Sequence, residues 1–304
     1  MESVRLATYA MGTRFELVLC GPDGRHLRAA GDEAIDAIED AHRRLTAFAR
    51  DSVIGRINAM AGFGPVCVDA EILDLLLLCE RVRDASEGAF NVAVGGLMER
   101  RGFRRSPSGR AGRDGARGGC GLAIDAKAGT VEVREDGASV DLGAVGKGFA
   151  LDLAAECLRD GGVTSAFMHG GTSTAVGIGR RPDGAPWTLR LPAPAGGEPL
   201  DVPLEDVAIS VSGDGYDRRG SGPGHVIDAR TGESVRRRPA ACLARSAALS
   251  DAWATALLAS GSRPEGMPTE VTSIAWMDGG WRIEPNPAAA AKAARALAMS
   301  EDAL

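Results

Sequence analysis

Long apolar runs and aromatic residues are scarce in this sequence of 304 residues. No apolar stretch reaches about 18 residues, the length that a membrane-spanning helix needs, so we expect no membrane anchor. The first residues do not combine a basic segment with an apolar one, so we expect no signal peptide and a cytoplasmic protein. Because aromatic residues make up only 4% of the chain, aliphatic side chains and alanine must fill the core.

An excess of positive charge is also missing, since 35 basic residues face 41 acidic ones and the net charge is -6. Neutralising the phosphates of a nucleic acid needs a basic face, so nucleic acid is not an expected partner. Cysteine pairs at zinc-binding or redox spacing are absent too, and no histidine cluster accompanies the cysteines. We expect free, buried thiols in a reducing compartment at Cys20, Cys67, Cys79, Cys120, Cys157 and Cys242.

What remains is the composition of a globular protein with many turns, with 44% hydrophobic residues and 41 glycines. Hydrophobic periodicity alternates between the helical and the extended pattern, so the expected fold class is α+β, with mixed or antiparallel sheets and packed helices. The pattern predicts helices over 27–48, 69–82, 147–160 and 251–259, the second with Asp69 as its N-cap. It predicts strands over 14–20, 130–133, 139–142, 165–168, 187–191, 207–211, 272–277 and 281–284.

We expect a single domain over residues 1–304, with two segments that stand apart from its body. Residues 104–119 contain five arginines and five glycines, which fits either a nucleic-acid patch or a solvated, mobile surface loop. The lack of interleaved aromatic residues favours the loop. The alanine-rich tail, 288–304, predicts a surface helix.

The segment from Asp141 to Gly148, DLGAVGKG, lies between a predicted strand and a predicted helix. Its glycines allow the backbone to approach a ligand, and the helix N-terminus offers N–H groups and a positive dipole end to a phosphate. Lys147 adds a charge, although the spacing is not that of a Walker A loop. On this evidence alone the segment is either a phosphate-binding loop or an ordinary strand-to-helix turn.

Two further segments have residues suited to chemistry. Asp251 and Thr255 are four residues apart and share one helix face, so they can present two oxygens to one ion such as Mg²⁺. The alternative is that Ser250 or Asp251 caps the helix. His225 begins the segment HVIDARTG, where it is either a general base or a structural histidine.

Taken together and in this order, these segments resemble the FAD:protein FMN transferases of the ApbE family along nearly the whole chain. Each motif is loose, but seven in the correct order make the resemblance specific to the family. The matching segments are 11–13, 48–59, 88–103, 141–152, 169–172, 224–232 and 251–255.

The resemblance implies a T-shaped α+β fold that binds FAD in a cleft, with one or two Mg²⁺ ions on the pyrophosphate. It implies that Asp251, Thr255 and the backbone oxygen of Ala144 hold the metal. It also implies that His225 deprotonates a Thr or Ser hydroxyl of an acceptor flavoprotein, which then takes FMN while AMP is released. The residues that would line the FAD site are Met11, Phe48, Ala89, Phe90, Asn91, Asp141, Lys147, Gly171, Thr172 and Ile227.

The sequence departs from the family pattern at several of these positions. Thr172 and Asn91 replace acidic residues, and Phe48 replaces a tyrosine. Two other functions stay open beside the transferase. A magnesium-dependent FAD pyrophosphatase would share the same metal and FAD sites, and the two lost carboxylates make a non-catalytic FAD-binding protein plausible. A serine hydrolase is not indicated, because Ser212-Gly213-Asp214 does not form a nucleophile elbow.

Overall fold

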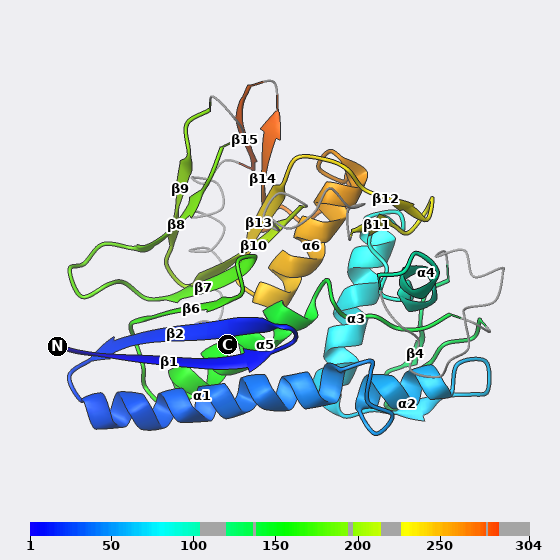
Figure 1. The fold of residues 1–304 in the computed structure, drawn as a ribbon, viewed down its shortest axis with the longest axis horizontal. Coiled ribbons are helices and arrows are strands. Elements are labelled where there is room, and N and C mark those ends of the chain that lie inside the picture. The colour runs from blue at the N-terminus through cyan, green and yellow to red at the C-terminus, as the bar shows by residue number, and fades with distance from the viewer. Residues whose placement is uncertain (104–119, 136–137, 194–196, 214–225, 278, 286–304) are drawn as a thin grey trace.

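The computed structural model describes residues 1–103, 120–135, 138–193, 197–213, 226–277 and 279–285 (Figure 1). The predicted loop 104–119, the tail 288–304 and His225 therefore lie outside the described residues. Among the helices in the described ranges, none combines the length and the apolar character that crossing a bilayer requires.

In the described part of the chain, the largest sheet has eight strands in the order β1-β2-β6-β7-β10-β13-β14-β15. Each neighbouring pair is antiparallel. The α+β class with antiparallel sheets is thereby confirmed. The strands span Glu2–Ala10 (β1), Thr13–Gly21 (β2), Ala166–Gly170 (β6), Thr174–Ile178 (β7), Val207–Ser212 (β10), Ala240–Ala244 (β13), Thr272–Met277 (β14) and Gly280–Glu284 (β15).

Three helices cover one face of this sheet: α1 (Gly24–Leu45), α5 (Gly146–Asp160) and α6 (Ala247–Ser260) (Figure 1). The antiparallel hairpin of β8 (Trp187–Leu191) and β9 (Leu200–Leu204) covers part of the other face. Successive residues of β10 point to opposite faces, as in any strand. Ala208 therefore joins the core beneath the helices, whereas Ile209 and Val211 pack with the β8–β9 hairpin.

The smaller elements surround α3 on one side of the molecule (Figure 1). They include a three-stranded sheet in the order β3-β5-β4 and a two-stranded pair of β11 and β12. Their bounds are Val53–Ala59 (α2), Ala70–Ala85 (α3), Gly95–Arg100 (α4), Val66–Cys67 (β3), Ala123–Asp125 (β4), Thr130–Glu132 (β5), Ile227–Asp228 (β11) and Glu233–Ser234 (β12).

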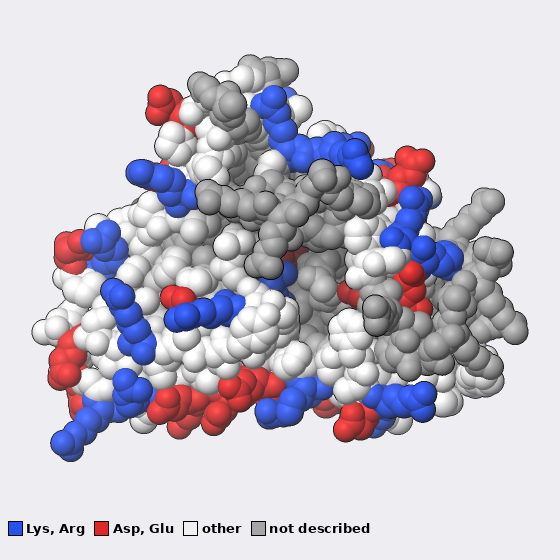
Figure 2. All heavy atoms as spheres, viewed as in Figure 1, with Lys and Arg blue, Asp and Glu red and all other residues white. Residues whose placement is uncertain are grey.

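Helix α1 follows the predicted apolar stripe, since Leu27, Ala34, Ile38 and Leu45 are buried at helical spacing. Its other side is solvated, and Figure 2 shows acidic side chains gathered along the edge of the molecule where α1 lies. The helix ends at Leu45 because Thr46 has an extended backbone. The expectation that it continues to Phe48 is therefore wrong.

The predicted strand 139–142 is not formed. The backbone of Val140 instead pairs with the side-chain amide of Asn58, at 2.6 Å for the N–H and 3.0 Å for the carbonyl oxygen. The Asp141 N–H donates to the Val92 carbonyl at 2.8 Å. The polar backbone groups are thus satisfied without a neighbouring strand, and the segment 89–93 is placed beside the glycine-rich loop.

Helix α6 begins four residues before its predicted start. Its N-cap is Ser246, whose hydroxyl accepts a hydrogen bond from the Leu249 N–H at 3.1 Å. Asp251 therefore lies inside the helix and is not its cap, and it is only 3% exposed. A buried carboxylate in a helix interior needs polar partners from other elements.

Helices α5 and α6 meet closely at Gly148 and Asp152. A Cβ atom at Gly148 would clash with the backbone carbonyl of Ala247. One turn further along α5, the half-buried Asp152 carboxylate accepts hydrogen bonds from the Ala247 N–H at 2.6 Å, the Ala248 N–H at 2.9 Å and the Ser246 hydroxyl at 2.7 Å. Burial raises the pKa of Asp152 above its ordinary value, and the hydrogen bonds from α6 oppose this rise.

All six cysteines are free, as expected, but they are not all buried. Cys20, Cys79 and Cys242 lie in the interior, and burial raises the pKa of the Cys79 and Cys242 thiols. Cys120 and Cys157 are only half-buried, so the prediction of buried thiols is wrong for them. It is also wrong for Cys67, which is exposed because the short strand β3 leaves its side chain at the surface.

The α5–α6 contact predicts that Gly148→Ala destabilises the protein by about 1–3 kcal/mol, since overpacking against backbone cannot relax by a side-chain rotation. Gly146→Ala is the matched control, because its Cβ would meet only Leu45 and Met11 side chains at 3.6 and 3.7 Å. We expect Gly146→Ala to leave the free energy of unfolding unchanged or slightly higher. Urea denaturation measures both variants, and equal stability of the two would contradict the packing argument.

Candidate functional site

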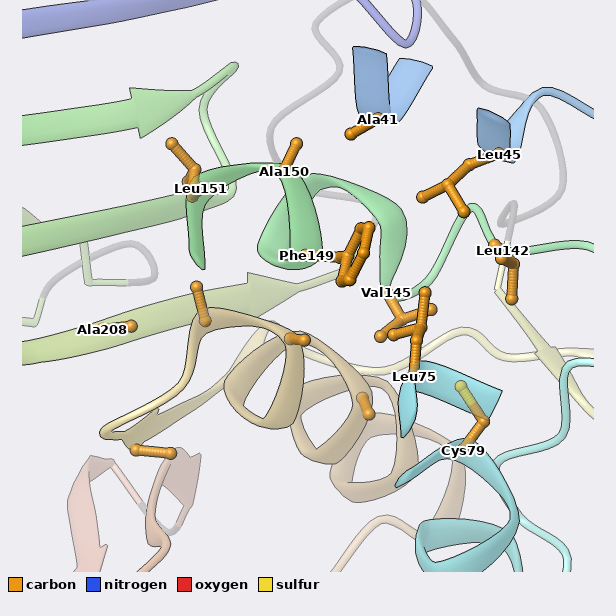
Figure 3. Packing of buried hydrophobic residues seen from close by; sticks show 14 of the residues in the cluster. Ala41, Leu45, Leu75, Cys79, Leu142, Val145, Phe149, Ala150, Leu151 and Ala208 are labelled. Atoms are coloured by element: carbon orange, nitrogen blue, oxygen red, sulfur yellow. The ribbon is translucent and has the colours of Figure 1, made fainter. Parts of the chain in front are cut away.

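The loop between Asp141 and Lys147 is anchored by two apolar side chains. Leu142 and Val145 are buried and lie beside Leu45 of α1 and Leu75 of α3 (Figure 3). Asp141 turns the chain, because its Oδ1 accepts a hydrogen bond from the Gly143 N–H at 2.8 Å. The residues between these anchors, Gly143 and Ala144, remain accessible at the surface.

Asp251 is the carboxylate toward which this loop and α5 converge. Its Oδ2 atom lies 3.3 Å from the Gly148 N–H donor and 3.6 Å from Lys147 Nζ. Lys147 also donates to the Gly143 carbonyl at 3.3 Å. The N-cap residue of α5, Val145, makes no capping hydrogen bond with its own side chain, and Asp251 binds a first-turn N–H of the helix instead. The positive end of the helix dipole and the ammonium group thus face the same carboxylate.

The other oxygen of Asp251 is held by strand β10. Ser210, which is fully buried, donates from its hydroxyl to Asp251 Oδ1 at 2.6 Å. One helix turn further along α6, the Thr255 hydroxyl lies 3.2 Å from the Ser212 hydroxyl. The structure thus brings together Asp251, Thr255, Lys147 and the loop that carries Ala144.

The sequence analysis did not predict Ser210 and Ser212 as residues of this site. Ser210 and Ser212 alternate with apolar residues in a strand whose both faces are buried. Two polar residues at a spacing of two on one buried face indicate a polar partner across that face. The spacing of the two serines can be read from the sequence, but it identifies a site only when the helix that packs on that face of the strand is known.

Two turns carry other predicted site residues. Met11 lies in the turn between β1 and β2 with a positive φ of 50°, and its N–H donates to His42 Nδ1 at 3.3 Å. A Cβ on Gly146 would lie 3.7 Å from Met11 Sδ, so this turn borders the glycine-rich loop. Gly171 follows β6 with a φ of 64°, and its N–H donates to the Arg14 carbonyl at 2.8 Å. Thr172, the next residue, is exposed.

The segment that contains Ala89, Phe90 and Asn91 borders the loop through its backbone. The side chains of Ala89 and Phe90 are each 1% exposed and belong to the core. Asn91 is 7% exposed, and its Oδ1 accepts from the Ala93 N–H at 2.8 Å while its Nδ2 donates to the Cys120 carbonyl at 3.0 Å. A carboxylate could not donate to Cys120, so the local hydrogen bonding fits the amide that stands here.

Phe48 and Ile227 lie at opposite extremes of exposure. Phe48 is 65% exposed, in the connection between α1 and α2. Ile227 is 7% exposed in β11, which packs against α6. The next residue, Asp228, forms an ion pair with Arg230 at 2.7 Å. His225, the predicted base, precedes β11 and lies outside the described residues.

In the described part of the chain, no group of three or more His, Cys, Asp or Glu side chains is arranged so that it could hold a metal ion. The predicted ligands are one carboxylate (Asp251), one hydroxyl (Thr255) and one backbone carbonyl (Ala144). These are hard oxygen donors, which suit Mg²⁺. A set with one negative charge fits an ion that keeps waters and takes further oxygens from a substrate's phosphates.

The chain is similar in sequence to known proteins along most of its length. A sequence model of the ApbE family matches residues 11–268. The FAD:protein FMN transferase of Vibrio cholerae is 26% identical over 283 residues, covering 86% of this chain and 82% of that protein. The protein of the same name from Klebsiella pneumoniae is 28% identical over 272 residues, covering 83% and 77% of the two chains.

Solved structures agree in fold. The flavin transferase ApbE from Vibrio cholerae superposes with a TM-score of 0.74 at 26% identity, covering 93% of this chain and 96% of the other. The ApbE protein from Thermotoga maritima has a TM-score of 0.76 at 23% identity, covering 94% and 98%, a likeness that shows the fold alone.

The Asp228–Arg230 pair predicts a pH dependence of stability. Burial alone would raise the pKa of Asp228, but the Arg230 hydrogen bonds outweigh burial and hold this pKa below its ordinary value of 3.8. The contribution of the pair is therefore fully present above that value and is lost as the pH falls through the lower, folded-state pKa.

We expect Asp228→Asn to lower the free energy of unfolding near neutral pH, by an amount that shrinks as the pH falls below 3.8. Urea denaturation across this pH range measures the difference. Asp201→Asn, at the exposed pair with Arg190, is the control and should change stability much less, because water screens that pair. A difference that is independent of pH would contradict the assignment.

Proposed function

The chain belongs to the ApbE family, and we propose that it transfers FMN from FAD to a hydroxyl group of an acceptor protein and releases AMP. The family match spans most of the chain, and relatives that it covers over three quarters or more of their length are named FAD:protein FMN transferases. The observation that carries the proposal is the buried Asp251 carboxylate, held beside Lys147, the Thr255 hydroxyl and the N-terminus of α5.

In this proposal Asp251, Thr255 and the Ala144 carbonyl hold Mg²⁺. When bound, Mg²⁺ neutralises charge on the pyrophosphate and on the departing phosphate. Lys147 and the positive end of the α5 dipole attract the same phosphates. The close approach that phosphates need is open at the loop, because Gly143 carries no side chain and is exposed.

The reaction is a displacement at phosphorus. The acceptor's Thr or Ser oxygen forms a bond to the FMN phosphorus, and the bond from that phosphorus to the bridging oxygen breaks. AMP leaves with the bridging oxygen. The hydroxyl proton goes to His225, which we propose as the base on the family resemblance and on its ability to titrate near neutral pH.

Those of the remaining predicted residues that lie at the surface bind and orient FAD. The turn with Met11, the exposed Phe48 ring and the turn with Gly171 and Thr172 offer side chains and backbone for this role. Asn91, which stands where the family has a carboxylate, holds the segment beside Asp141 in place through its amide hydrogen bonds.

The decisive experiment mixes the protein with FAD, Mg²⁺ and an acceptor domain bearing a Thr or Ser flavinylation site. Intact masses and free nucleotides are then measured. We expect the acceptor to gain the mass of FMN while AMP appears. Free FMN and AMP with an unlabelled acceptor would favour the pyrophosphatase. Bound FAD that stays intact would favour a binding protein and contradict the proposal.

Asp251→Asn should lower the rate of AMP release by about 100-fold or more, because it removes the single charged ligand from the site. The amide has nearly the same volume, so the fold should survive, which circular dichroism checks. Asp201→Asn removes an exposed carboxylate in β9 and should keep the wild-type rate. An Asp251→Asn rate equal to wild type would refute the metal assignment.

His225→Ala should slow FMN transfer by about 100-fold or more while leaving FAD affinity close to wild type, because a base acts on the acceptor hydroxyl and not on FAD. Fluorescence titration gives the FAD affinity, and acceptor mass gives the rate. Equal losses of both would make His225 a structural residue.

A further inference from the structure

Strand β10 presents two hydroxyl groups to the helix that carries the proposed metal ligands. Ser210 contacts Asp251 at 2.6 Å and Ser212 contacts Thr255 at 3.2 Å. Ser210 is fully buried and Ser212 is 9% exposed. The two serine hydroxyls therefore contact the two side chains that we propose as metal ligands.

The direction of the hydrogen bonds at Ser210 follows from the donor inventory. A carboxylate only accepts, so the Ser210 hydrogen is given to Asp251 Oδ1. The Ser210 oxygen can then only accept from the Thr174 hydroxyl, which lies 3.2 Å away on the neighbouring strand β7 and is 2% exposed. Two aligned hydroxyls thus end on one carboxylate oxygen, and each strengthens the next.

This chain of hydroxyls fixes the orientation of the carboxylate. The χ2 angle of an aspartate is broad by itself, so an unsupported Asp251 could turn either oxygen toward the loop. The bond from Ser210 occupies Oδ1 and leaves Oδ2 toward the Gly148 N–H and Lys147. Because β10 pairs with β7 on one side and β13 on the other, the donor itself is held rigidly.

We propose that Ser210, supported by Thr174, is a positioning residue for Asp251 that keeps Oδ2 directed to the cation and phosphate side of the site. This inference rests on the proposed function, since it gives Asp251 the metal. A merely structural hydroxyl would stabilise the fold without affecting metal affinity.

The chain offers a matched control for that alternative. Ser250 is the residue before Asp251, is fully buried, and donates its hydroxyl to the Cys242 carbonyl on β13. Ser250→Ala removes a buried hydroxyl from the same helix and leaves the Ser210–Asp251 hydrogen bond in place. It should therefore lower stability without weakening metal binding.

The test measures protein-bound Mn²⁺ by water-proton relaxation in the presence of ADP, which supplies a pyrophosphate but no FMN to transfer. Ser210→Ala should weaken Mn²⁺ binding about 10-fold, as is typical when a residue behind a metal ligand is removed. The Mg²⁺ concentration for half-maximal AMP release from FAD should rise by the same factor, with kcat at saturating Mg²⁺ close to wild type. Thr174→Val, which keeps the side-chain shape, should weaken Mn²⁺ binding less, by about threefold.

Wild-type Mn²⁺ affinity in Ser210→Ala, or an equal loss in Ser250→Ala, would overturn the proposal. If Ser210→Ala does not fold, Thr174→Val decides, and unchanged affinity in that variant overturns it. Asp251→Asn separates this inference from the proposed function. Equal Mn²⁺ binding by wild type and Asp251→Asn, or none by wild type, removes the metal assignment and the positioning role together.

Discussion

The close contact between α5 and α6 at Gly148 and Asp152 is the constraint from which the site follows. Without a side chain at Gly148, the two helices approach until the Gly148 N–H reaches Asp251 Oδ2 at 3.3 Å. Asp152 fixes the N-terminus of α6 to α5 through three hydrogen bonds. The helix that presents the proposed phosphate-binding groups and the helix that presents the proposed metal ligands are therefore one rigid unit, set before any ligand arrives.

The proposed metal site depends on a single carboxylate, that of Asp251. The Ser210 and Ser212 hydroxyls hydrogen-bond Asp251 and Thr255 without adding negative charge. A second carboxylate beside Asp251 would repel it unless a cation were always present. With one carboxylate, the Lys147 ammonium group, 3.6 Å from Asp251 Oδ2, is sufficient to balance the negative charge. Such a site holds a divalent ion most firmly when the substrate's phosphates arrive with it.

The sequence was informative where a pattern is local. The apolar spacing in α1 and the Asp69 cap of α3 predicted both helices, and the order of seven loose motifs indicated the family. The sequence was less informative where a residue far away in the chain determines the local structure. The segment 139–142 alternates like a strand, yet Asn58 takes its hydrogen bonds. The start of α6 combines a local cap, Ser246, with a distant one, Asp152, 95 residues away from Ala247, and neither the Ser250 nor the Asp251 alternative indicated it.

The pairing between β10 and α6 shows how such distant information could be recovered. Residues i and i+4 of a helix are separated by about 6 Å along its axis, and residues i and i+2 of a strand by about 6.6 Å. A helix that runs along a strand can therefore match Asp251 and Thr255 to Ser210 and Ser212, one hydroxyl for each ligand, as the two hydrogen bonds require. Either pair alone is ambiguous, since two serines or an Asp and a Thr occur by chance. Because each spacing presents two oxygens at nearly the same separation, the two patterns together predict a row of paired polar groups between strand and helix, and this row holds the proposed metal ligands in place.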